Sequence, residues 1–182
     1  GHKWVTNSKT RKKELTDVLQ RDFPPQLLFL ERSLQLLQPE GRLGIVLPES
    51  LFGSSSYSHI ISWLQSKAEI QAIAAMPDPL FKTGGKQGTH TKVCIVVLKK
   101  RPFPKSSSTI FMGDAKWCGH DSRGNPTVRV DAEGREILLD DIPYIATHYI
   151  QYRDRKLTSN DHLGFALPRS EITGTILIPK YY

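Results

Sequence analysis

Residues able to bind a metal gather in one short polar segment of the sequence. Cys118, His120 and Asp121 lie close together there, and a thiolate beside an imidazole could begin a zinc site. A structural zinc ion needs four ligands, usually in two separated pairs, and the sequence has no second Cys/His pair. We therefore predict no metal site here, but a loop held by side-chain hydrogen bonds.

A second segment with unusual composition is the glycine-rich stretch 77–90. Its glycines Gly84, Gly85 and Gly88 precede an apolar run instead of opening a helix, which is the wrong context for a dinucleotide cradle. The phosphate-binding loop, the nucleophile elbow and the zinc-protease motif are all missing from the sequence. We predict a flexible loop, whose length on a sheet makes it a candidate place for function.

The elements that would position this loop follow an α/β pattern. Apolar residues recur at spacings of three and four from Gln26 until Pro39-Glu40-Gly41 stops them, which predicts an amphipathic helix. Strand, helix and strand follow and fit one crossover of a parallel sheet. No helix precedes the last strand, so we expect it to pair antiparallel with the one before. The predicted helix, strand, helix, strand and strand occupy residues 26–38, 42–48, 54–67, 70–76 and 92–98.

Four segments can be separated by composition. Residues 1–25 are polar and basic and end in two prolines, which predicts a surface arm or linker. Residues 26–104 hold the α/β core. Residues 105–157 are rich in turn residues and read as an extension whose stretch 127–137 forms a small hairpin turning at Asp131 to Gly134. Residues 158–182 close the chain with a strand-like run.

Composition limits the classes of function. With 182 residues the chain is too short for a multidomain enzyme. A net charge of +7 favours polyanionic partners such as nucleic acid. Cys94 lies in an apolar run far from Cys118, so we expect no disulfide. No apolar run is long enough to span a bilayer and the start does not read as a signal peptide, which predicts a cytoplasmic protein without membrane partners.

An ordered set of motifs resembles a known family. The run Leu28-Phe-Leu-Glu-Arg-Ser-Leu-Gln-Leu-Leu-Gln-Pro-Glu-Gly-Arg-Leu-Gly-Ile-Val-Leu-Pro-Glu-Ser50 is followed by Trp63-Leu64, Pro77, Phe81-Lys82 and the strand 92–98, then by Ile110-Phe-Met and Cys118-Gly-His-Asp-Ser-Arg-Gly-Asn-Pro126. Together they resemble the N-6 adenine DNA methyltransferases of restriction-modification systems, including type I modification subunits. The resemblance covers most of residues 24–152.

This resemblance implies the second half of a Rossmann-like sheet that uses S-adenosylmethionine and methylates a flipped-out adenine. The family's glycine-containing cofactor motif and its Asn/Asp-Pro-Pro-Tyr/Phe catalytic motif are missing from the sequence. The stretch Asp22-Phe23-Pro24-Pro25 has two prolines but no aromatic residue after them, so we do not interpret it as the catalytic motif. We expect no catalytic or cofactor-binding residue in this chain, and hence a fragment that is inactive and binds no cofactor alone.

One residue role follows from the resemblance. Related enzymes stack an aromatic side chain on the extruded base, and Phe81 occupies the matching position. An aromatic face restores roughly 1 to 3 kcal/mol of the stacking energy that a flipped base loses. The alternative is that Phe81 caps the hydrophobic core. Lys82 and Lys86 beside it could contact phosphates, or could simply be solvated.

The implied partners are DNA and a specificity subunit or fused target-recognition domain, with residues 158–182 as the start of a target-recognition-like region. The alternative is a non-enzymatic nucleic-acid-binding or subunit-docking module that works through its basic arm and hairpin. A half sheet would also leave the flank of the strand 43–47 uncovered. We therefore expect either self-association through this edge or coverage by the arm.

Overall fold

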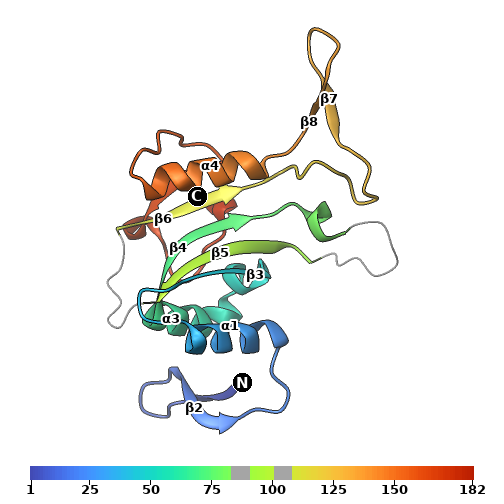
Figure 1. Cartoon of the computed structure of the whole chain (residues 1–182). Helices are drawn as coiled ribbons and strands as arrows, with labels where there is room; N and C mark the ends of the chain where they lie inside the picture. The colour runs from blue at the N-terminus through green and yellow to red at the C-terminus, as the bar shows by residue number, and fades with distance from the viewer. Residues whose placement is uncertain (83–90, 101–107) are drawn as a thin grey trace.

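A five-stranded mixed sheet forms the centre of the molecule in the computed structural model, which describes residues 1–82, 91–100 and 108–182 (Figure 1). Its strand order is β3-β5-β4-β6-β9, with β4 parallel to β6 and every other neighbouring pair antiparallel. The strands are β3 (Arg42–Pro48), β5 (Val93–Lys100), β4 (Ala68–Ala75), β6 (Thr109–Asp114) and β9 (Phe165–Pro168). The protein is therefore of the α/β type that its sequence pattern predicts.

The predicted strand pairing is confirmed in part. β4 and β5 are antiparallel neighbours, as expected for two strands joined without a helix. β3 and β4 run in the same direction, since both are antiparallel to β5, but they are not hydrogen-bonded to each other. β5 lies between them. The prediction that β3 and β4 are adjacent parallel strands of one crossover is therefore wrong. β3 is left at one edge of the sheet.

Helices cover both faces of this sheet (Figure 1). The helices α1 (Pro25–Leu36) and α3 (Ser58–Lys67) share one apolar cluster with the sheet, to which Leu30, Leu64 and Ile73 belong. The helix α4 (Ile142–Arg153) packs on the other face through a smaller cluster that contains Phe111 and Ile145. Strand residues alternate between the two clusters because successive side chains of a strand point to opposite faces.

The helix α1 is the predicted amphipathic helix. Leu27, Leu30 and Leu34 are buried at the expected spacing. The helix starts with Pro25, a position where a backbone N–H would have no partner within the helix, so proline is tolerated there. At its other end the Lys100 ammonium donates to the carbonyl oxygens of Leu34 and Leu37, at 2.6 and 2.7 Å. A cation there satisfies carbonyl groups that the helix itself leaves unpaired.

Residues beyond 104 extend the central sheet, which the sequence pattern did not predict. The buried side chains of Ile110, Phe111 and Met112 place β6 inside the sheet, and α4 covers it. Segment 105–157 is therefore more than a hairpin extension. The apolar run of β6 is short and lies among turn residues, so its composition alone looked like that of a loop. The predicted hairpin is nevertheless confirmed within this segment.

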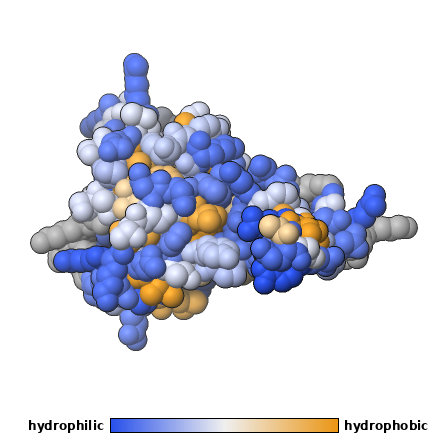
Figure 2. Space-filling model, turned by 90° about the horizontal axis from the view of Figure 1, so that it is seen from above, coloured by the Kyte–Doolittle hydropathy of each residue, from blue (hydrophilic) through white to orange (hydrophobic). Residues whose placement is uncertain are grey.

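That hairpin consists of β7 (Val128–Val130) and β8 (Glu136–Leu138) and projects away from the sheet (Figure 1). The Asp131 carboxylate accepts hydrogen bonds from the backbone N–H groups of Glu133 and Arg135. Gly134 has a φ of 79°, a conformation that glycine adopts without steric cost. Seen from the α4 side, the surface is mainly hydrophilic with small separate apolar patches (Figure 2).

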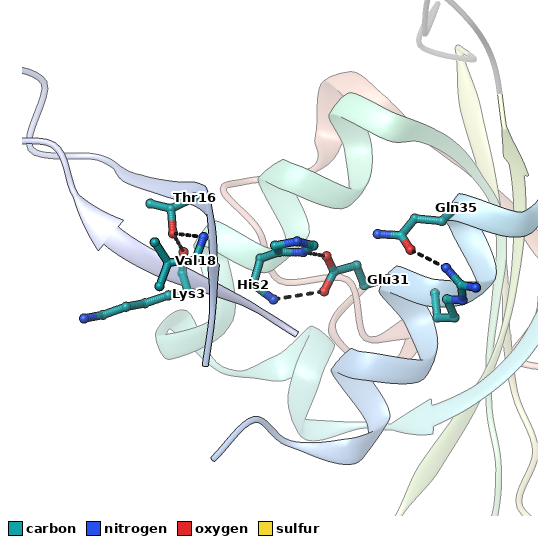
Figure 3. A network of polar contacts seen from close by, with 7 residues as sticks. His2, Lys3, Thr16, Val18, Glu31 and Gln35 are labelled. Carbon is teal, nitrogen blue, oxygen red and sulfur yellow. Dashed lines mark hydrogen bonds and ion pairs between the residues drawn. The ribbon is translucent and has the colours of Figure 1, made fainter. Parts of the chain in front are cut away.

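The N-terminal segment, predicted as a surface arm or linker, contains regular structure. β1 (His2–Thr6) and β2 (Lys13–Leu19) form a separate antiparallel hairpin. Glu31 of α1 is buried. Its carboxylate accepts a hydrogen bond from the backbone N–H of His2 and also contacts the His2 ring (Figure 3). Trp4 packs edge-on against His59 and Trp63 of α3. The hairpin thus covers the α1 and α3 layer, and no strand of the described residues pairs with the outer edge of β3.

Short helical turns complete the described parts. They are α2 (Ser50–Gly53), η1 (Ser55–Tyr57), η2 (Asp78–Phe81), η3 (Arg169–Glu171) and η4 (Pro179–Tyr181). The Ser54 side chain caps η1 by accepting a hydrogen bond from Ser56 N, one turn before α3. Among the described residues, no helix is long and apolar enough to cross a membrane.

Candidate functional site

The carboxyl ends of three strands meet at one edge of the sheet. β3, β4 and β6 all run in one direction and end at Pro48, Ala75 and Asp114. Register pairs these ends directly: Ala75 lies opposite Asp114, and Pro48 lies opposite Val93, where β5 begins. In open α/β sheets, ligands bind outside the carboxyl ends of the strands. We therefore take this carboxyl edge as the candidate site.

Phe81 lies on the turn that follows β4 at this edge. The turn η2 begins after Pro77, and Leu80 packs against the cluster beneath α4. Phe81 itself has 46% of its surface exposed. The side chain that anchors the turn is therefore Leu80, while the Phe81 ring is accessible from solvent. Its role in stacking on a base stays a prediction.

Of the two lysines predicted near Phe81, only Lys82 lies within the described residues. Lys82 directly follows η2, and its backbone N–H donates to the carbonyl oxygen of Pro79. Lys86 lies outside the described residues. A cation that the sequence pattern did not single out, Lys92, lies 3.8 Å from the Asp78 carboxylate at the start of the same turn. Positive charge therefore accompanies Phe81 at this edge.

Acidic groups at the edge were missed by the sequence reasoning. Glu49 directly follows β3, is buried, and pairs with the Lys180 ammonium at 3.1 Å. Burial, together with the negative charge of Glu49, raises the pKa of the Asp114 carboxyl. The only signal for Asp114 was its place behind the short apolar run of β6. Lys180 is distant in sequence from Glu49, so no local pattern could have paired them.

Cys94 lies within β5 at the same edge and is fully buried. Burial, with a smaller effect of Glu49 and Asp114, raises the pKa of its thiol to about 12. A thiol with this pKa stays protonated at physiological pH and is a poor nucleophile, because the thiolate is the reactive form. Cys94 therefore acts as a core residue, and both cysteines are free, as expected from their spacing.

The segment around Cys118 is a hydrogen-bonded loop, as predicted. Asp121 accepts hydrogen bonds from the backbone N–H groups of Arg123 and Asn125 and from the Asn125 side chain. The Cys118 sulfur lies 3.8 Å from Nε2 of His120. Within the described ranges, no group of three metal-ligating side chains comes together.

Asp114 gives a pH-dependent prediction. Because its folded-state pKa is raised, the carboxyl favours folding fully only below its unfolded pKa, and this contribution is lost as pH rises through the folded pKa. Asp114→Asn should therefore raise the melting temperature by a few degrees at neutral pH and change little at acidic pH. Circular-dichroism melting across that pH range measures this.

Asp131→Asn is the control, because the pKa of Asp131 is shifted in the opposite direction to that of Asp114. Hydrogen bonding by the backbone of Arg135 lowers the pKa of the Asp131 carboxyl. Its contribution is present above the unfolded pKa and lost as pH falls through the folded pKa. The Asp131 variant should lose stability at neutral pH only. Equal melting curves for the Asp114 variant and the parent at neutral pH would contradict the burial argument.

The fold is similar to that of solved proteins of type I restriction-modification systems. A methyltransferase subunit of a type I restriction-modification system from Streptococcus thermophilus is 19% identical, with a TM-score of 0.56 over 94% of this chain and 33% of that chain. A structure of a type I restriction-modification system is 17% identical, with a TM-score of 0.56 over 80% of this chain and 29% of that chain. These likenesses show the fold, a mixed α/β sheet.

The chain belongs to the N-6 DNA methylase family, whose model matches residues 1–161. This match includes the hairpin β1–β2, which lies outside the resemblance read from the motifs. A protein of Methanocaldococcus jannaschii, named as a type II restriction enzyme and methyltransferase, is 29% identical over 91 residues, which are 50% of this chain and 7% of that protein. The chain thus spans about a third or less of the length of each of these relatives.

Proposed function

We propose that this chain is part of a DNA adenine-N6 methyltransferase of a restriction-modification system and supplies the side of the active site that faces the target base. The family match over residues 1–161 carries this proposal. The carboxyl edge supports it, because the exposed Phe81 ring lies at the place where such sheets bind ligands. The alternative of a separate nucleic-acid-binding module lacks comparable support.

The cofactor for methyl transfer would be S-adenosylmethionine. The segments that follow the described strands do not fit it. A nucleotide-type cofactor needs a glycine turn that opens a helix, but Glu49 follows β3 and Met76-Pro77 follows β4. Glu49 is moreover occupied by its ion pair with Lys180. We therefore place cofactor binding and the transfer chemistry in another part of a longer enzyme, and this chain is inactive alone.

Two measurements test this proposal. Isothermal titration calorimetry of the chain with S-adenosylmethionine should give no heat of binding. The complete reading frame that contains the chain should form N6-methyladenine in DNA, detected by mass spectrometry after digestion to nucleosides. Tight cofactor binding by the chain, or a complete protein that yields no N6-methyladenine, would each refute one half of the proposal.

The free edge of β3 leads to a prediction about association. Among residues 1–82, 91–100 and 108–182, the hairpin β1–β2 pairs only with itself and no strand pairs with the outer edge of β3, whose Val46 is 47% exposed. An uncovered edge presents unpaired backbone groups that invite a strand from a second copy. We expect light scattering to give twice the 20.6 kDa mass of the chain. Val46→Lys should shift the population toward the monomer, and a monomeric parent would contradict the idea.

A further inference from the structure

An open cleft of about 750 Å³ lies between the hairpin β1–β2 and the start of α3, and Phe81 is not one of its lining residues. The hairpin contributes three consecutive cations, Arg11, Lys12 and Lys13. Asn7 holds their turn, since its side chain accepts hydrogen bonds from the backbone N–H groups of Lys9 and Thr10. Along the described stretches, none of the three cations forms an ion pair within 4.0 Å.

The opposite wall of this cleft carries hydroxyl groups and rings. Four serines line it, namely Ser55, Ser56, Ser58 and Ser62. Behind them Trp4 meets the His59 ring at 4.9 Å and the Trp63 ring at 6.2 Å, in edge-on contacts. Burial and the nearby Lys13 charge lower the pKa of His59, so its ring is neutral at physiological pH. The positive charge of the cleft therefore comes from the hairpin.

In the part of the chain that the structure describes, Glu14 supplies the one carboxylate that lines the cleft. Its Oε1 atom accepts a hydrogen bond from the Asn7 side chain at 2.9 Å, so it is engaged within the hairpin. Three cations, four hydroxyl donors and one acidic group give the cleft a net positive charge. This is the chemistry that contacts phosphate oxygens in protein–DNA interfaces, where arginine, lysine and serine side chains are the usual donors.

The serine wall of the cleft lies toward the carboxyl edge of the sheet. The chain leaves β3 at Pro48, on the carboxyl edge, and η1 and α3 follow within a few residues. α3 then leads back to the start of β4, which runs parallel to β3. The first turns of α3 are thus near the carboxyl edge, and those turns carry Ser58 and Ser62.

We propose that this cleft binds the phosphate backbone of duplex DNA. A strand supplies one phosphate for each of the three cations, whereas a single mononucleotide concentrates its charge at one point. The inference rests on the proposed function only in taking DNA as the substrate. The cleft would hold the backbone while the target base lies at the carboxyl edge beside Phe81, so that the two contacts fix the position of the duplex.

Fluorescence anisotropy with a short labelled duplex tests the cleft on the 182-residue chain. The triple variant Arg11→Gln, Lys12→Gln and Lys13→Gln should weaken binding about tenfold at about 0.1 M salt, and the slope of log K against log salt should fall by about 2 to 3. The charge-matched control changes Arg153, Arg155 and Lys156, at the end of α4 on the other face of the sheet, to glutamine. The control should lose much less affinity.

A second variant reaches the cleft without altering the hairpin. Ser58→Glu with Ser62→Glu places two carboxylates on one face of α3, four residues apart. Acidic residues near a helix start are compatible with the helix dipole, so its melting curve should match that of the parent. It should nevertheless bind DNA at least about tenfold more weakly, because the new charges repel phosphate.

Several outcomes would overturn the proposal. These are a parent chain that does not bind DNA, an equal loss in the α4 control, unchanged binding by both cleft variants, or displacement of DNA by millimolar inorganic phosphate or deoxyadenosine monophosphate at constant ionic strength. The last would identify a mononucleotide pocket. Failure here differs from failure of the proposed function: a complete enzyme that methylates adenine while cleft variants bind normally refutes only the cleft.

Discussion

Phe81→Ala in the complete enzyme should lower methyl transfer to DNA between about 5-fold and about 100-fold. The range corresponds to the roughly 1 to 3 kcal/mol that stacking on an aromatic ring gives a base. The ring is free to do so, because Leu80 anchors the turn η2 and 46% of the Phe81 surface is exposed. Single-turnover methylation, with 2-aminopurine fluorescence at the target position, measures both transfer and base flipping.

The matched control is Phe29→Ala on α1. Phe29 is also a solvent-exposed phenylalanine, at 68%, but it lies on the helix layer and not at the carboxyl edge. This variant should methylate normally. Phe81→Trp should retain most activity, since a larger ring preserves the stacking surface. Unchanged methylation and unchanged fluorescence in Phe81→Ala would show that the exposed ring has no role in holding the base.

Local sequence patterns predicted those parts of the fold that local interactions determine. The helix α1 was evident from the spacing of Leu27, Leu30 and Leu34, and the hairpin β7–β8 from the turn at Asp131 to Gly134. Phe81 was placed by resemblance, and the structure then located it on an exposed turn. Periodicity and turn chemistry act over a few residues, which is why they can be read directly from the chain.

Long-range pairing could not be read in the same way. β6 is short and flanked by turn residues, and only its position between β4 and β9 makes it a core strand. The hairpin β1–β2 contains mostly polar residues and depends on contacts of Trp4 with α3. The cleft above α3 joins residues 11–13 to residues 55–62, which no local pattern relates. Tertiary context determines each of these features.

The acidic part of the carboxyl edge depends on the final residues of the chain. Glu49 follows β3 but meets Lys180 only because the segment after β9 returns to this edge. Leu177 and Ile178 of that segment are buried in the cluster with α1 and α3. The segment 158–182, expected from its sequence to begin a target-recognition region, therefore also packs against the core.

Phe52 is the residue through which this packing can be tested, and Phe52→Ala should lower the free energy of unfolding by about 3 to 5 kcal/mol. The Phe52 ring is fully buried in α2, and its carbonyl oxygen accepts a hydrogen bond from the backbone N–H of Leu177 at 2.9 Å. Removing the ring leaves a cavity where α2 meets the C-terminal segment. Urea denaturation followed by circular dichroism measures the loss.

Phe29→Ala serves again as the comparison, because removal of a mostly exposed ring should change stability by no more than about 0.5 kcal/mol. Leu177→Ala should also be destabilising, by about 2 to 5 kcal/mol, since its side chain is fully buried in the same cluster. The double variant should lose less than the sum of the two single losses, because neighbouring residues that share a cavity are not independent. Strict additivity, or a loss below about 1 kcal/mol for Phe52→Ala, would show that the C-terminal segment does not pack on α2 in solution.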